Sequence, residues 1–105
     1  MVELDQSYAN IKYGVAGTAL HTPVRGEIEV LQDSLIVIDQ AGLIESILTP
    51  TNAPYKKVKN DLKEHGKLLE LSNTEYLLPG LIDLHIHAPQ WPQMGKALHL
   101  PLYDW

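Results

Sequence analysis

An unbroken apolar run, Leu35-Ile36-Val37-Ile38, limits what this chain can fold into more than any other feature. Neighbouring side chains of a strand point to opposite faces, so such a run fits a strand that is buried on both faces. The segment from Ile11 to Val15 alternates apolar and polar residues, and Leu43 to Leu48 reads as a further strand. We therefore predict an antiparallel meander over residues 10–49, with turns at Gln32-Asp33 and at Asp39-Gln40-Ala41-Gly42.

A helix is predicted directly after the meander. Asn52-Ala53-Pro54 is typical of a helix start, and the apolar residues Tyr55, Val58 and Leu62 follow at helical spacing. Gly66 fits a left-handed C-terminal cap, and short extended segments are expected at 67–71 and 75–78. A small meander normally needs further strands or a helix to close its core, so the pattern predicts packing between the two.

A second extended segment, Leu81 to His87, follows a break at Pro79-Gly80. On a strand, its period of two places His85 and His87 on one face, where two imidazoles can present nitrogen ligands to one ion at about 2.0–2.1 Å. On spacing alone, a His-x-His pair more often belongs to surface or hydrogen-bonded core histidines. Catalytic zinc also normally has three protein ligands, so two histidines do not make a complete site.

The residues around the two histidines carry a family resemblance. The stretch from Pro79 to His87 resembles the signature Pro-Gly-x-x-Asp-x-His-x-His of the first barrel strand in the amidohydrolase superfamily. Its continuation, His-Ala-Pro-Gln at 87–90 and Leu-Pro-Leu-Tyr-Asp-Trp at 100–105, is similar to guanine deaminases. The resemblance covers roughly residues 10–105 and is specific over 79–105.

The resemblance implies a mixed α/β fragment. An antiparallel β-meander, part of a composite β-sandwich, is expected to be followed by one helix and the first strand of a (β/α)₈ barrel. Residues 1–9 would be a leader, 10–78 the N-terminal part of the β-sandwich domain, and 79–105 the start of the TIM-barrel catalytic domain. Because a barrel needs roughly 250 residues and the chain has 105, we expect the catalytic domain to be truncated.

The resemblance also implies a chemistry, the zinc-dependent hydrolysis of guanine to xanthine and ammonia. His85 and His87 would be metal ligands, and Asp83 is expected to be structural. The residues expected to contact the substrate are His87, Gln90, Trp91, Leu100 and Trp105, with Leu102 beside them, although ordinary packing is the alternative for the apolar ones. Two further histidines, an aspartate and a general acid/base glutamate are not identifiable in this chain. The zinc site would therefore be incomplete, and the fragment alone is expected to be inactive.

Two alternative hypotheses are also compatible with the sequence. The chain can belong to another amidohydrolase that acts on a cyclic amidine, such as a different deaminase or a chlorohydrolase. It can also be a non-catalytic remnant that serves only as a structural or binding module. The absence of cysteine excludes the zinc deaminase architecture that uses Pro-Cys-x-x-Cys.

Composition bears on partners and compartment. A net charge of −5 argues against nucleic acid as the main partner, since phosphate binding requires clustered lysine and arginine. No apolar run approaches the roughly 20 residues that a membrane span needs. We expect a cytoplasmic enzyme that is a homodimer at full length. The isolated chain is expected to be marginally stable or to associate through exposed strand edges.

Overall fold

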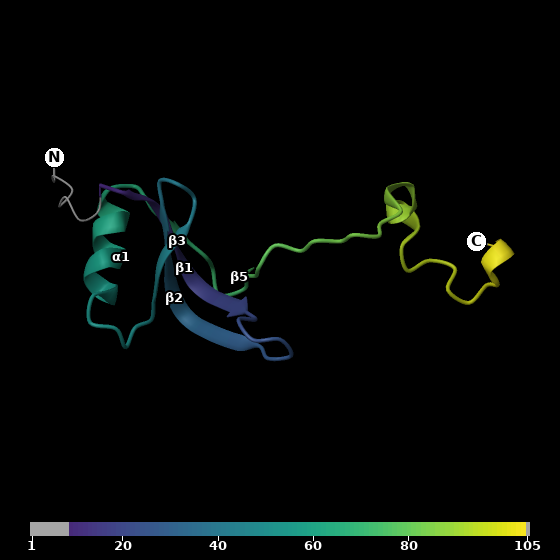
Figure 1. Cartoon of the computed structure of the whole chain (residues 1–105), viewed down its shortest axis with the longest axis horizontal. Coiled ribbons are helices and arrows are strands. Elements are labelled where there is room, and N and C mark those ends of the chain that lie inside the picture. Colours follow the sequence, from purple (N-terminus) through teal and green to yellow (C-terminus); the bar gives the residue numbers. More distant parts are fainter. Residues whose placement is uncertain (1–8, 105) are drawn as a thin grey trace.

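The computed structural model describes residues 9–104, which form a five-stranded sheet, a helix beside it and an extended C-terminal part (Figure 1). Residues 1–8 of the predicted leader, and Trp105, lie outside the described residues. The elements are β1 (Ile11–His21), β2 (Glu29–Asp39), β3 (Ile44–Leu48), α1 (Tyr55–Glu64), β4 (Leu68–Glu70), β5 (Tyr76–Leu77) and the 3₁₀ segments η2 (Ala88–Gln93) and η3 (Leu102–Asp104).

The strand order is β3-β2-β1-β4, and β5 also pairs with β1. The β1–β2 and β2–β3 pairs are antiparallel, so the predicted meander is confirmed. The two short strands that follow the helix both run parallel to β1. A parallel pairing needs a crossover connection, and the chain supplies it through α1 between β3 and β4.

The apolar run of β2 is buried on both faces, as predicted. Leu35 and Val37 are 0% and 1% exposed and belong to the core under the helix, while Ile36, of opposite parity, is also buried. From α1, three residues reach that core: Tyr55, Val58 and Leu62. Because this small core unites the helix with the central strands, we expect it to be the main source of the chain's stability.

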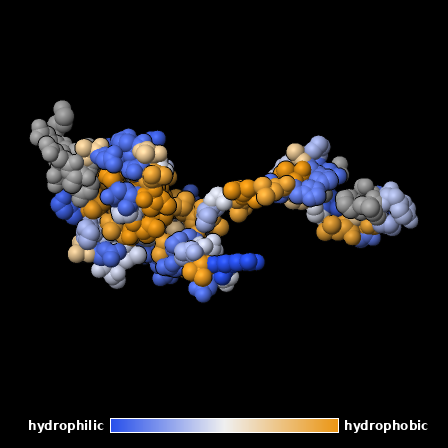
Figure 2. Space-filling view, viewed as in Figure 1, coloured by the Kyte–Doolittle hydropathy of each residue, from blue (hydrophilic) through white to orange (hydrophobic). Residues whose placement is uncertain are grey.

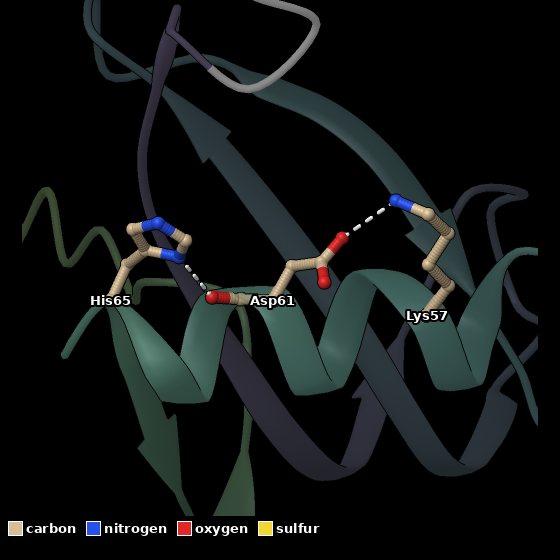
Figure 3. Close-up of polar contacts among 3 residues, drawn as sticks. All are labelled: Lys57, Asp61 and His65. Atoms are coloured by element: carbon tan, nitrogen blue, oxygen red, sulfur yellow. Dashed lines mark hydrogen bonds and ion pairs between the residues drawn. The ribbon is translucent and has the colours of Figure 1, made fainter. Parts of the chain in front are cut away.

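Helix α1 matches its predicted bounds closely. It begins at Tyr55, directly after Pro54, and ends at Glu64 before Gly66, whose φ of +65° is the expected left-handed C-terminal conformation. Figure 3 shows the exposed side of the helix, where Lys57 Nζ lies 2.8 Å from Asp61 Oδ2. The Asp61 carbonyl accepts a hydrogen bond from His65 Nδ1 at 2.6 Å. Among residues 9–104, no helix is long and apolar enough to cross a membrane.

The predicted turn at Gln32-Asp33 is wrong, since β2 continues through it. Asp33 adopts a φ of +49°, and the β1–β2 register shifts opposite it, between Gly17 and Ala19. Ser34 Oγ donates to the Gly17 carbonyl at 2.9 Å, which supplies a partner for this buried hydroxyl. A bulge therefore absorbs the two polar residues without ending the strand.

A polar turn joins β4 to β5. The Ser72 backbone N–H donates to Glu75 Oε1 at 2.9 Å, and Glu75 N in turn donates to the Ser72 carbonyl at 3.2 Å. The hydrogen bonds from the Ser72 backbone and side chain favour the ionised carboxylate and so lower the pKa of Glu75. This reciprocal pair lies in the turn between β4 and β5, and both strands run in the same direction along β1.

The sheet face away from α1 carries an apolar hollow of about 350 Å³. Ile36 and Val15 lie at its buried base, whereas Ile44 and Ile47 on β3 are 60% and 38% exposed at its rim. β3 is also an end strand in the order of the described sheet, with one edge unpaired. We expect the isolated chain to associate with increasing concentration, because exposed apolar strand edges pair with one another.

Sedimentation velocity over a range of concentrations measures that association. Ile47→Lys should shift the chain toward monomer, because a charge on an edge strand opposes pairing. Glu45→Lys, an exposed position of the same strand, is the matched control for an added lysine. A chain that sediments as a single monomer over the whole concentration range would contradict the expectation.

Candidate functional site

The segment that leads from the sheet to the histidine pair is extended and exposed. Leu81, Ile82 and Leu84 are 96%, 86% and 94% exposed, and Figure 2 shows this segment as a hydrophobic surface between the sheet and the C-terminal part. The predicted strand from Leu81 to His87 is therefore wrong in this structure. The physical reason is that no strand among the described residues pairs with it, and an unpaired strand gains no ladder hydrogen bonds.

The two predicted metal ligands nevertheless converge. Nε2 of His85 lies 3.0 Å from Nε2 of His87, and the rings stack with their centroids 5.1 Å apart and 26° between their planes. On a regular strand, residues two apart stand roughly 6.5–7 Å apart along the chain. A bend at Leu84 and His85 brings the rings together instead. The expectation that both imidazoles point the same way holds, but a bend rather than a pleat achieves it.

The pair fits two positions of a zinc site. Two nitrogens bound tetrahedrally at 2.0–2.1 Å lie about 3.3 Å apart, close to the separation seen here. In the present contact, one Nε2–H donates a hydrogen bond and the other Nε2 accepts it through its lone pair. A metal would need the lone pairs of both nitrogens. No cluster of three or more metal-ligating side chains occurs within the described part of the chain. Among the described residues, this pair would therefore supply only two of the ligands of such a site.

His85, His87 and the predicted base-binding residue Gln90 all line one hollow of about 480 Å³. Its lining comprises Asp83, His85, Ile86, His87, Gln90 and the segment 94–98. Gln90 sits on η2, where its backbone N–H donates to the His87 carbonyl at 2.8 Å. This turn places Gln90 beside the histidine segment, and the residue lines the same hollow. The hollow is open, since the side chains of both histidines and Gln90 are exposed.

The other predicted contacts lie elsewhere or outside the description. Trp91 is 69% exposed and Leu100 38% exposed, and neither lines the hollow. The side chain of Leu102 and all of Trp105 lie outside the described residues. The assignment of these residues to substrate binding stays a prediction.

Sequence reasoning missed the wall formed by residues 94–98. Gly95 and Ala97 have φ values of +78° and +57°, and the bend they produce turns Met94 and Leu98 toward the histidines. Gly95 was the available signal, because glycine after a proline-rich stretch favours a reversal. Ala97 gave no signal, since a positive φ is uncommon for a residue with a side chain.

Known proteins resemble this chain over most of its length, although no protein-family model matches it. A probable guanine deaminase of Schizosaccharomyces pombe is 36% identical over 85% of the chain, and the guanine deaminase of Rattus norvegicus is 37% identical over the same share. The chain is similar to guanine deaminases over this share of its length. Guanine deaminase from Homo sapiens is 35% identical, again over 85% of the chain.

The match covers only a small part of each relative. The chain spans about a fifth of the length of the guanine deaminases it matches, 17% to 19% for these three. A 5'-deoxyadenosine deaminase of Methanopyrus kandleri is 27% identical over 90% of the chain and 20% of its own length. The similarity therefore lies with deaminases, and is greater for those named for guanine.

Proposed function

We propose that this chain supplies the first metal-binding and base-binding segment of a zinc-dependent guanine deaminase. The single observation that carries the proposal is the convergence of His85 and His87, with Nε2 atoms 3.0 Å apart, on a hollow that Gln90 also lines. Homology to guanine deaminases over 85% of the chain supports the choice of substrate.

The proposed reaction converts guanine and water into xanthine and ammonia. The water oxygen forms a bond to the amino-bearing carbon, the carbon–nitrogen bond breaks, and a proton passes to the departing nitrogen. When bound, a zinc ion supplies Lewis-acid chemistry that makes water acidic enough to react near neutral pH. His85 and His87 would hold this ion, which requires both imidazoles to be neutral.

Gln90 is proposed to orient the purine. Its amide carries two N–H donors and a carbonyl acceptor, which suits the mixed donor and acceptor edge of guanine. Its position beside the histidines would keep the amino-bearing carbon near the reacting water. Two further histidines, an aspartate and a glutamate acid/base, implied by the resemblance, would complete the site.

The same proposal covers the wider architecture. Residues 10–78 would belong to a β-sandwich domain, and 79–105 would open a (β/α)₈ barrel in a cytoplasmic homodimer. The exposed Leu81, Ile82 and Leu84 support the barrel assignment, because neighbouring strands and helices would bury these side chains. The uncovered hollow on the sheet face away from α1 supports the sandwich assignment in the same way.

A chimera tests the proposed activity. Residues 10–104 of this chain would replace the N-terminal counterpart in the Rattus norvegicus guanine deaminase, which matches the chain at 37% identity over 89 residues. We expect the chimera to convert guanine to xanthine, followed by ultraviolet absorbance, and the 105-residue chain alone to be inactive. A folded, zinc-loaded chimera that does not deaminate guanine would contradict the proposal. If such a chimera instead deaminates 5'-deoxyadenosine, the alternative suggested by the Methanopyrus kandleri relative is favoured.

A further inference from the structure

A carboxylate beside the histidine pair makes a specific backbone contact. Asp83 Oδ1 accepts a hydrogen bond from the backbone N–H of His85 at 3.0 Å. An aspartate that accepts from the N–H two residues later forms an Asx turn, which sets the direction of the chain locally. Asp83 also lines the same hollow as both histidines. Its turn coincides with the bend that brings the two rings together.

The two histidines are thus held from opposite ends. Asp83 fixes the N–H of His85, and the N–H of Gln90 fixes the carbonyl of His87 at 2.8 Å. The segment between these two anchors is exposed to solvent. Because few packing contacts restrain this segment, its conformations are limited mainly by local hydrogen bonds. Without the Asp83 contact, the backbone at His85 could rotate and separate the two Nε2 atoms.

We propose that Asp83 is a positioning residue that holds His85 in register with His87 for metal binding. The proposal rests on the proposed function, because it assumes that the histidine pair binds zinc. Asp83 acts through its hydrogen bond to the backbone and not through its charge. Groups that support metal ligands in this indirect way commonly change metal affinity by about 10–100-fold when replaced.

Three substitutions separate the hydrogen bond from the charge. Asp83→Asn keeps an oxygen at the same position and removes the charge, whereas Asp83→Glu keeps the charge and lengthens the side chain past the Asx geometry. Asp83→Ala removes both. If Asp83 acted as a charge or as a direct ligand, the glutamate variant would bind zinc well and the asparagine variant poorly. The turn predicts the opposite order.

The test is a titration of the full 105-residue chain with zinc alone, followed by NMR of the histidine ring and backbone nitrogens. We expect weak zinc binding at His85 and His87, a loss of about tenfold in Asp83→Ala and Asp83→Glu, and near wild-type affinity in Asp83→Asn. In the metal-free chain, hydrogen exchange of the His85 amide should quicken in the alanine and glutamate variants only. Equal zinc affinities in all four chains, or a loss in Asp83→Asn matching that in Asp83→Ala, would overturn the proposal.

The same titration distinguishes failure of the positioning role from failure of the zinc role. A His85→Ala chain should lose the ring shifts caused by zinc. If wild type and His85→Ala respond to zinc identically, zinc binding by this chain and the positioning role are both overturned, whereas the role of the histidines in a complete site is tested separately in the chimera. If His85→Ala loses binding and Asp83→Ala does not, only the positioning role is overturned.

Discussion

Replacing either His85 or His87 by alanine in the active chimera is expected to lower kcat/KM for guanine at least about 100-fold. Residues that merely support metal ligands cost about 10–100-fold when replaced, so loss of a ligand itself should cost no less. The two Nε2 atoms lie 3.0 Å apart and would share one ion, so removing either opens the same site. The double variant should therefore lose little beyond the single variants, as is usual for residues that act as a unit.

His99→Ala provides the matched control for these variants. His99 is exposed and does not line the hollow, so the same chemical change there should leave kcat/KM within about twofold. Steady-state assays should be accompanied by zinc analysis of each purified protein. A His87→Ala chimera that keeps both its zinc and its activity would refute the assignment of this residue as a ligand.

Leu62→Ala is expected to cost the isolated chain about 2–5 kcal/mol of unfolding free energy, enough to unfold much of a marginal protein. Leu62 is 0% exposed and lies at the centre of the contact between α1 and the sheet. A methyl group built on Gly14 would lie 2.7 Å from Leu62 Cδ1, which shows how closely the helix approaches β1. Truncation would leave a cavity at that contact.

Leu81→Ala is the matched control for the core substitution. It makes the same change at a side chain that is 96% exposed, so it should alter stability by less than about 0.5 kcal/mol. Urea unfolding followed by circular dichroism measures both variants under identical conditions. Similar losses for the two leucines would mean that the helix–sheet core described here does not carry the stability.

The parts of the fold predicted well are those in which local pattern and packing agree. Leu35, Ile36 and Val37 form an apolar run, and the structure buries all three within the meander. Tyr55, Val58 and Leu62 recur at helical spacing and face the sheet in the same way. In both cases the residues that bury these side chains belong to the same described core, so the predicted strand and helix could form.

The parts predicted badly depend on information that local pattern does not carry. Leu81 to His87 alternates like a strand, but a strand forms only where another can pair with it, and none does among the described residues. Asp33 reads as a turn, yet its positive φ is absorbed by a bulge opposite Gly17. The spacing of His85 and His87 predicted that their rings lie on one side of the chain. The wall at 94–98 depends on the positive φ of Ala97, and nothing about an alanine side chain predicts that conformation.

The short range of the contacts around the histidine pair has a practical consequence. The bonds from His85 N–H to Asp83 and from Gln90 N–H to His87 span two and three residues, whereas the core joins residues as distant as Ile11 and Leu62. Substitutions in the two regions share no partner, so their free energies should add. Natural or engineered variants of this chain can then be sorted by two measurements. A shifted melting curve with a normal zinc response marks a folding defect, and the reverse marks a defect of the site.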